Sequence, residues 1–151
     1  MMVLRITQAV VLVGQFFCLG CQSQNRTGAQ VVGPGASGPT VIAYYFHRTI
    51  RCPMCIAIEA NASQSIERNF QQEVTEGRLI WMPVNLEDAE SEGFQERFDL
   101  SGSALVIAQA NDGIHQRHKK LDKVWSLVSD PEALSAYVTE EIRQYLNEQG
   151  R

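Results

Sequence analysis

The sequence has no excess of positive charge, no apolar run of membrane-spanning length and no glycine-rich phosphate loop. Its 151 residues include 13 Lys and Arg against 17 Asp and Glu, a formal net charge of −4. Nucleic-acid binders usually carry a basic balance or a basic stripe, so this composition argues against a nucleic-acid partner. The hydrophobic fraction of 44% is not that of a polytopic membrane protein. Without a phosphate loop or a Ser–His–Asp signature, nucleotide hydrolases and serine hydrolases are excluded as expected classes.

What the sequence does contain is four cysteines in two close pairs, Cys18/Cys21 and Cys52/Cys55. A chain of this length can bury a core and form one domain without disulfide staples. Four cysteines allow three disulfide connectivities, but here their positions are more informative than their number. The two pairs lie in different parts of the chain, and we expect them to have different roles.

The first pair ends an apolar N-terminal stretch. Residues 6–20 are mostly apolar, follow a positive charge at Arg5, and are fewer than the roughly 20 residues of a membrane-spanning helix. The ending Gly20-Cys21 resembles a bacterial lipoprotein signal. This resemblance implies cleavage before Cys21, a lipid on its thiol, and an exported protein, periplasmic or in the cell envelope, with the lipid as its membrane anchor. Ordinary cleaved export and an uncleaved anchor are the alternatives.

This interpretation divides the chain into three parts. Residues 1–20 are the predicted signal peptide, residues 21–40 a flexible linker, and residues 41–149 the folded domain. The linker is rich in glycine and proline and has no apolar periodicity. A flexible chain of this length spans about 25 Å, which would let the domain stand off a membrane surface.

From Val41 onward, strand and helix patterns alternate. Val41–Phe46 is a continuous apolar run of strand-forming residues, typical of a buried central strand. Apolar residues then recur every four positions, which predicts a helix from about Cys52 to about Val74, with Gly77 ending it. The later segments are predicted as a strand, a polar helix, a hairpin of two strands and a closing helix: 79–84, 87–98, 105–108 with 114–119, and 130–146.

This order of elements predicts the fold class. Strands separated by helices favour parallel pairing with right-handed crossovers, and the hairpin adds one antiparallel partner. We therefore expect an α/β protein, a thioredoxin-like three-layer sandwich around a central mixed four-stranded sheet.

The second cysteine pair, in Cys52-Pro53-Met54-Cys55, lies at the predicted junction between the first strand and the first helix. At a helix N-terminus, Cys52 would face unpaired backbone N–H groups and the positive end of the helix dipole, which stabilise a thiolate. Cys55 follows one turn later, within reach of a disulfide, and Pro53 suits the first turn because its missing N–H costs nothing there. Arg51 could lower the thiol pKa further. Cys52 is thus the predicted attacking thiolate and Cys55 the resolving thiol.

Three other interpretations of this pair remain open. It could be a static disulfide. It could belong to a copper or zinc site, with His47 and Met54 completing a soft set of ligands. The fold could also serve as a non-catalytic docking module. Redox exchange itself needs no cofactor, and its expected partner is a protein dithiol or disulfide, such as a membrane electron donor.

Several short motifs resemble one branch of thioredoxin-like bacterial proteins, the nitrophenyl-compound nitroreductase subunits of the ArsF type. These motifs are Tyr44-Tyr45-Phe46-His47, Arg51-Cys52-Pro53-Met54-Cys55, Glu59-Ala60, Val84-Asn85 and Leu121-Asp122-Lys123-Val124-Trp125. The resemblance implies a thioredoxin fold, a redox-active cysteine pair and a supporting role in an exported or membrane-linked reductive system. Ser103-Ala104 stands where thioredoxins carry a cis-proline, and Arg51 stands where they carry a tryptophan.

The remaining distinctive residues have ordinary structural explanations beside functional ones. His47 could make a local hydrogen bond in its loop, or transfer a proton or bind a ligand. The basic run at residues 115–120 suits an edge strand, where charge discourages unwanted pairing, or a surface for an acidic partner or anionic lipid. Trp81 and Trp125 are expected at the core or its edge. The acidic residues between 87 and 99 are expected on a solvated helix face.

Overall fold

The computed structural model describes residues 39–148. Residues 1–38 and 149–151 lie outside the described part, and with them the predicted signal peptide, the lipidation site at Cys21 and the linker up to residue 38. The elements in chain order are β1 Pro39–His47, α1 Pro53–Asn69, α2 Gln71–Thr75, β2 Leu79–Asn85, the 3₁₀ turn η1 Ala89–Ser91, α3 Phe94–Arg97, β3 Ala104–Asn111, β4 Ile114–Lys120, α4 Val124–Leu127 and α5 Pro131–Glu148.

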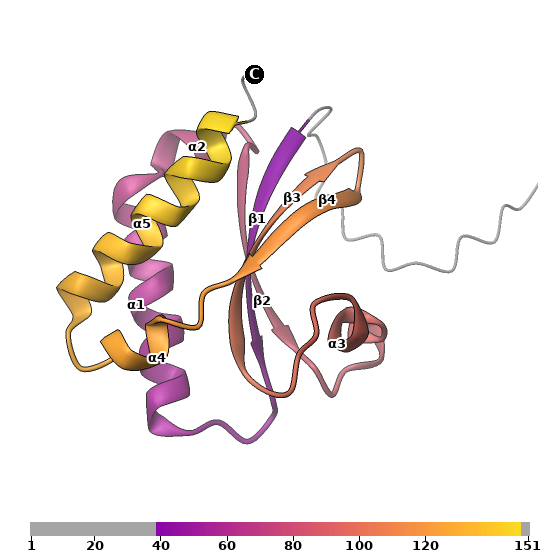
Figure 1. Cartoon of the computed structure of the whole chain (residues 1–151), viewed down its shortest axis with the longest axis vertical. Coiled ribbons are helices and arrows are strands. Elements are labelled where there is room, and N and C mark those ends of the chain that lie inside the picture. Colours follow the sequence, from indigo (N-terminus) through magenta and orange to yellow (C-terminus); the bar gives the residue numbers. More distant parts are fainter. Residues whose placement is uncertain (1–38, 149–151) are drawn as a thin grey trace, which may run out of the picture.

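The four strands form one mixed sheet in the order β2-β1-β3-β4 (Figure 1). β1 is a central strand, as its apolar run predicts; it pairs parallel with β2 and antiparallel with β3. β3 also pairs antiparallel with β4, so the sheet has two antiparallel pairings where the sequence predicts one. The reason is that the connection of residues 86–103 starts and ends at the same end of the sheet. This sheet order, with helices on both faces, is that of the predicted thioredoxin-like sandwich.

Alternation along β1 divides the core into two halves. Val41, Ala43 and Tyr45 are buried in a cluster with apolar side chains of α1 and α5. The alternate residues Tyr44 and Phe46 are buried in a second cluster with side chains around η1 and α3. Figure 1 shows α1 and α5 on one side of the sheet and α3 on the other. Because successive strand side chains point to opposite faces, a fully apolar strand must be covered on both.

The helix predicted from about Cys52 to Val74 is two helices. Phe70 separates them with φ −136° and ψ 30°, and its side chain is 2% exposed. Its N–H still bonds the Ile66 carbonyl oxygen at 3.0 Å, so the chain bends at this residue and resumes as α2. Gly77 follows α2 with φ 71°, a left-handed conformation that glycine adopts without strain.

The polar helix predicted over residues 87–98 is wrong in its extent. Only the turn η1 and the four-residue helix α3 form, and they are separated by Gly93 at φ 88°. The two aromatic residues of this segment nevertheless lie on one side, as their spacing predicts. The rings of Phe94 and Phe98 pack 5.4 and 5.6 Å from the Tyr44 ring.

β4 lies at the edge of the sheet, which confirms the predicted placement of its basic residues. Two of these basic side chains form ion pairs with residues in the C-terminal half of α5. Lys119 Nζ lies 2.7 Å from a Glu141 carboxylate oxygen, and Arg117 forms an ion pair with Glu148 while its guanidinium stacks 4.2 Å from the centre of the Tyr145 ring. These charges therefore fasten the edge strand to the closing helix.

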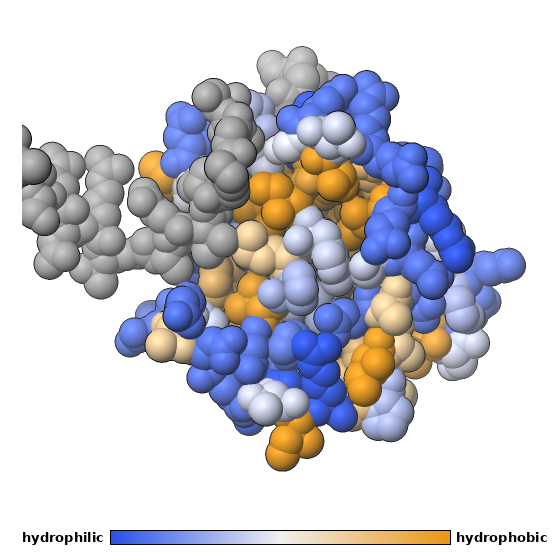
Figure 2. Space-filling model, turned by 180° about the vertical axis from the view of Figure 1, so that it is seen from behind, coloured by the Kyte–Doolittle hydropathy of each residue, from blue (hydrophilic) through white to orange (hydrophobic). Residues whose placement is uncertain are grey.

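Trp81 and Trp125 are partly buried against the core cluster beside α1 and α5, as predicted. On the back of the molecule, apolar side chains gather near the middle and hydrophilic ones border them (Figure 2). Between residues 39 and 148, the helices are all too short or too polar to cross a membrane.

Candidate functional site

The Cys52–Cys55 pair lies where β1 passes into α1. Cys52 is the N-cap residue of α1, with extended backbone at φ −77° and ψ 155°, and Pro53 is the first helical residue. The two cysteines form a disulfide, and their Cα atoms are 5.1 Å apart, within the range such a bond needs. Cys52 Sγ also accepts a hydrogen bond from the Cys55 N–H at 3.0 Å. One helical turn thus holds the sulfurs together and directs a backbone donor at the first of them.

The two sulfurs differ in their access to solvent. Cys52 is exposed, whereas Cys55 is 8% exposed and belongs to the core. A thiolate at Cys52 would keep its N-cap position, where backbone N–H groups and the helix dipole favour negative charge. The geometry therefore suits attack at or by Cys52, with Cys55 behind it.

Exposed apolar residues lie close to Cys52 in the sequence, on both sides of it. Ile50 is 93% exposed, Met54 53% and Ile56 52%, and Pro53 between them is exposed as well. Exposed large apolar residues are ordinary when scattered, but a group beside one reactive residue indicates a contact surface. We call Ile50, Pro53, Met54 and Ile56 the apolar rim.

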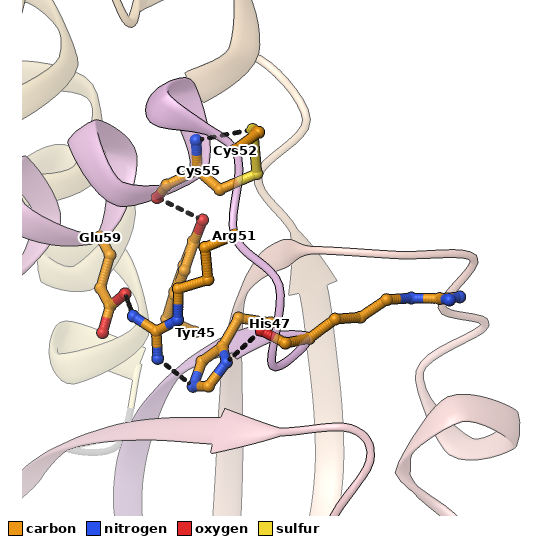
Figure 3. A network of polar contacts seen from close by, with 7 residues as sticks. Tyr45, His47, Arg51, Cys52, Cys55 and Glu59 are labelled. Carbon is orange, nitrogen blue, oxygen red and sulfur yellow. Dashed lines mark hydrogen bonds and ion pairs between the residues drawn. A yellow bond between two sulfur atoms is a disulfide. The ribbon is translucent and has the colours of Figure 1, made fainter.

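A polar network lies beneath the first turn of α1 (Figure 3). Tyr45, on β1, donates its hydroxyl hydrogen to the Cys55 carbonyl oxygen at 2.6 Å. Burial raises the pKa of Tyr45 to about 12, the Glu59 carboxylate adds to the rise, and the Arg51 guanidinium opposes it. The tyrosine thus remains a protonated donor and ties β1 to the turn that carries Cys55.

Arg51, expected beside the thiol, has its guanidinium elsewhere. It forms an ion pair with Glu59 of α1 and a hydrogen bond with Nε2 of His47. Figure 3 shows its side chain directed away from the disulfide, with the His47 ring at the far end of the network. Because a guanidinium only donates, Nε2 of His47 accepts, and its Nδ1 donates to the Arg48 carbonyl oxygen at 3.1 Å. His47 therefore makes the local hydrogen bonds that its loop position predicts.

Neither Tyr45 nor Glu59 is singled out by the sequence as part of the site. The spacing that would have identified Glu59 is its position four residues after Cys55, which puts both on one face of a helix. Tyr45 would follow from the alternation of β1, since odd-numbered residues face α1. The sequence does not predict the direction of the Arg51 side chain.

The loop before Cys52 is tied to the end of β2. The Thr49 N–H donates to a Glu87 carboxylate oxygen at 3.2 Å, and the Asn85 side-chain amide donates to the Thr49 hydroxyl at 3.1 Å. The Leu86 N–H bonds the His47 carbonyl oxygen at 2.8 Å. These contacts fix the part of the loop that precedes the exposed Ile50.

The metal alternative would need ligands beyond the two cysteines. Within residues 39–148, no three His, Cys, Asp or Glu side chains are grouped so that they could hold a metal ion. His47 lies in the Arg51 network, and the two sulfurs are bonded to each other. No observation in the described part of the chain favours the metal alternative.

A second cluster of titratable groups lies on the opposite face of the sheet. Arg97 donates to Nδ1 of His115 at 2.8 Å, which leaves Nε2–H to donate to the Tyr44 hydroxyl oxygen at 2.8 Å. Burial, together with the positive charges of Arg97 and His118, lowers the pKa of His115 to about 4. The neutral imidazole thus joins β4 to α3 and β1.

The chain matches no protein-family model and no curated protein. Among solved structures, it is similar to chloroplastic thioredoxin z with 17% sequence identity over 62% of this chain and 80% of that chain, at a TM-score of 0.34. The sheet order and the helix positions described above carry the fold assignment. The described part of the chain is a thioredoxin-like domain with a Cys-x-x-Cys disulfide at the N-terminus of α1.

Proposed function

We propose that this domain is a thiol–disulfide oxidoreductase that uses Cys52 and Cys55. The observation that carries the proposal is the asymmetry of the pair: an exposed sulfur at a helix N-cap is bonded to a buried sulfur one turn later. Thiolates react fastest where they are accessible and stabilised, and a helix N-terminus supplies that stabilisation. A static disulfide would gain nothing from this arrangement.

The reaction is a pair of exchanges in which sulfur bonds and electrons balance. The Cys52 thiolate attacks one sulfur of a partner disulfide, forms a mixed disulfide and releases the other partner sulfur as a thiolate. The Cys55 thiol then loses its proton to solvent and attacks Cys52 Sγ, which closes the Cys52–Cys55 disulfide and releases the second partner thiolate. The partner gains two electrons and the domain loses two. In reverse, a dithiol donor reduces the domain.

The apolar rim supports a polypeptide as the partner. Ile50, Met54 and Ile56 offer exposed apolar side chains close to Cys52 in the sequence. A protein segment with apolar side chains next to its cysteine would bury this surface on contact, at about 25 cal/mol per Å² of apolar area. A small charged disulfide has no apolar side chains with which to bury this surface.

The sequence supports a location for this chemistry outside the cytoplasm. We propose that the chain is exported, carries a lipid at Cys21, and exchanges electrons with a membrane-linked dithiol donor as a subunit of a reductive system. The support lies in residues 6–21, which fall outside the described part of the chain. Incorporation of radiolabelled fatty acid in a bacterial host tests it: Cys21→Ser should abolish the label, and Cys18→Ser should retain it. Label that persists in Cys21→Ser would contradict lipidation there.

The exchange itself is tested with two serine variants and a model peptide disulfide that has apolar flanking residues. Cys55→Ser should form a stable one-to-one mixed disulfide, because attack by Cys52 proceeds and resolution does not. Cys52→Ser should form little adduct at Cys55, since that sulfur is buried. Mass spectrometry of the peptide that contains residues 52 and 55 measures both adducts, and circular dichroism checks that each variant is folded. Equal amounts of adduct from the two variants would contradict the assigned roles of Cys52 and Cys55. The absence of adduct from both variants would contradict the proposed function.

A further inference from the structure

The Glu59 carboxylate binds the guanidinium of Arg51, the charged residue nearest in sequence to Cys52. Arg51 immediately precedes Cys52, yet its guanidinium pairs with the Glu59 carboxylate and with His47 Nε2. Both members of the ion pair are partly buried, with side-chain exposures of 30% for Arg51 and 19% for Glu59. The network in Figure 3 turns the guanidinium away from the disulfide. The sequence alone would have assigned this charge to the thiolate.

This pairing changes the field at Cys52. An unpaired guanidinium near the sulfur would stabilise the thiolate and lower the thiol pKa. A guanidinium paired with a carboxylate contributes much less, because the two opposite charges nearly cancel at a distance. The remaining stabilisation then comes from the N-cap position, where the Cys55 N–H points at Cys52 Sγ.

The Glu59 carboxylate also lies near Tyr45 and the turn that carries Cys55 (Figure 3). Glu59 lies one turn after Cys55 on α1, on the same helix face. Its charge also acts on the Tyr45 hydroxyl, which donates to the Cys55 carbonyl oxygen. Glu59 and Tyr45 thus lie together below the buried cysteine.

We propose that Glu59 is a positioning residue that withholds the Arg51 charge from Cys52 and so sets the acidity and the redox balance of the pair. This inference rests on the proposed function, because it assigns a regulatory role at the same site. Glu59 does not act on a substrate; it acts through Arg51.

The proposal predicts a specific coupling between the two residues. Glu59→Gln replaces the carboxylate with a neutral amide, so the guanidinium keeps only neutral acceptors, the new amide oxygen and His47 Nε2, and is freer to approach the sulfur. We expect the pKa of the Cys52 thiol to fall by about 0.5 unit, which is roughly threefold more thiolate at a pH below the pKa. At a pH above the thiol pKa, where the reduced form is mostly thiolate, the same shift stabilises the reduced form about threefold and raises the reduction potential by about 14 mV for a two-electron couple. In an Arg51→Gln background, the same Glu59→Gln change should shift the pKa by less than half as much.

The experiment is a double-mutant cycle on the full chain. The variants Glu59→Gln, Arg51→Gln and their combination are made in a Cys55→Ser background, and the rate of Cys52 alkylation by iodoacetamide is followed against pH by mass spectrometry of the Cys52 peptide. Glu59→Asp keeps the charge and should return the wild-type pKa. Glu67→Gln is the matched control, since Glu67 lies on the same helix, is exposed and bonds only Ser63 among the described side chains.

Each outcome decides the inference. A shift with Glu59→Gln that depends on Arg51 supports it, and equal shifts in both backgrounds overturn it, because simple addition of charges needs no positioning. An unchanged Cys52 pKa combined with slower closure of the disulfide in the Cys55-containing Glu59→Gln chain also overturns it and makes Glu59 a proton acceptor for Cys55. If the wild-type pair cannot be cycled between dithiol and disulfide, the proposed function fails, whatever the Cys52 pKa.

Discussion

The hydroxyl of Tyr45 ties the central strand to the backbone of the buried cysteine. It donates to the Cys55 carbonyl oxygen at 2.6 Å, and the tyrosine side chain is fully buried. Tyr45→Phe removes this hydrogen bond and keeps the ring, which stacks on Trp81 with a centroid distance of 6.4 Å. The variant therefore tests the hydrogen bond and little else.

At neutral pH the substitution should reduce the free energy of unfolding by about 1 to 1.5 kcal/mol, the usual net value of a buried hydrogen bond. Most of the packing remains, because the ring is unchanged and only one oxygen atom is lost. The helical partner of the Cys55 carbonyl is also retained, so its oxygen is not left wholly unsatisfied. A cost above about 3 kcal/mol would indicate a rearranged core.

The burial of this hydroxyl predicts that the cost of its removal changes with pH. The pKa of Tyr45 is raised from 10 to about 12 in the folded state. Its stabilising contribution is present below pH 10 and is lost as pH rises toward 12, because the unfolded state releases the proton first. At pH 11 the wild type has lost about 1.4 kcal/mol through this group, the value of one pH unit. Phenylalanine has no such loss, so the two proteins should be about equally stable near pH 11.

Urea unfolding of both oxidised proteins, with other thiols blocked, measures this at pH 7, 9, 10 and 11. The difference between the two should be constant up to pH 9 and then shrink toward zero. Other tyrosines and lysines titrate in both proteins and cancel in the difference. A difference that stays constant to pH 11, or is absent at pH 7, would refute the assigned role of Tyr45.

Two further predictions concern other parts of the fold. Because the pKa of His115 is lowered to about 4, its neutral form stabilises the protein above pH 6.5, and that stability is lost as pH falls toward 4. His115→Gln should flatten the urea-unfolding free energy over this range. The control His118→Gln, at an exposed position, should keep most of the wild-type slope, since the His118 charge is the smallest cause of the His115 shift. An unchanged slope in His115→Gln would contradict the neutral hydrogen-bonded imidazole. Gly93→Ala should lower the free energy of unfolding by about 1 kcal/mol or more in thermal or urea unfolding, since φ at this residue is +88°. Gly102→Ala is the control and should leave it unchanged, because this position has open space and no positive φ. Equal effects of the two substitutions would argue against the turn between η1 and α3.

The elements that the sequence predicts well are those in which burial and periodicity agree. The apolar run 41–46 could only be a strand covered on both faces, and it lies at the centre of the sheet. The helix start at Pro53 and the closing helix from Pro131 follow from local cap and first-turn preferences. These features depend on neighbouring residues, so one sequence suffices to predict them.

The elements that were mispredicted depend on tertiary packing. Phe70 interrupts the first helix where its ring enters the core, and no local breaker marks that position. Gly93 divides the acidic segment, because the turn is needed to place Phe94 on the sheet. In both cases burial of an aromatic ring outweighs the helical preference of its neighbours.

The candidate site also has a part that local sequence predicts and a part that depends on the folded arrangement. The helix N-cap position of Cys52 and its approach to Cys55 follow from the motif and from the strand before it. The direction of Arg51 does not, since a flexible side chain reaches either the thiol or Glu59 with no local preference. Contacts between residues eight or ten positions apart, such as Arg51 with Glu59 and Tyr45 with Cys55, need the folded arrangement to be known.

The central claim is that Cys52 and Cys55 form a working dithiol and not a static disulfide. Its most direct measurement is the equilibrium reduction potential of the pair, obtained by incubating the chain in graded thiol–disulfide buffers and counting alkylated Cys52 and Cys55 by mass spectrometry. We expect one reversible two-electron transition with a potential above about −300 mV, the range of labile and catalytic disulfides. A potential well below about −300 mV, or a pair that cannot be reduced reversibly while the domain remains folded, would contradict it.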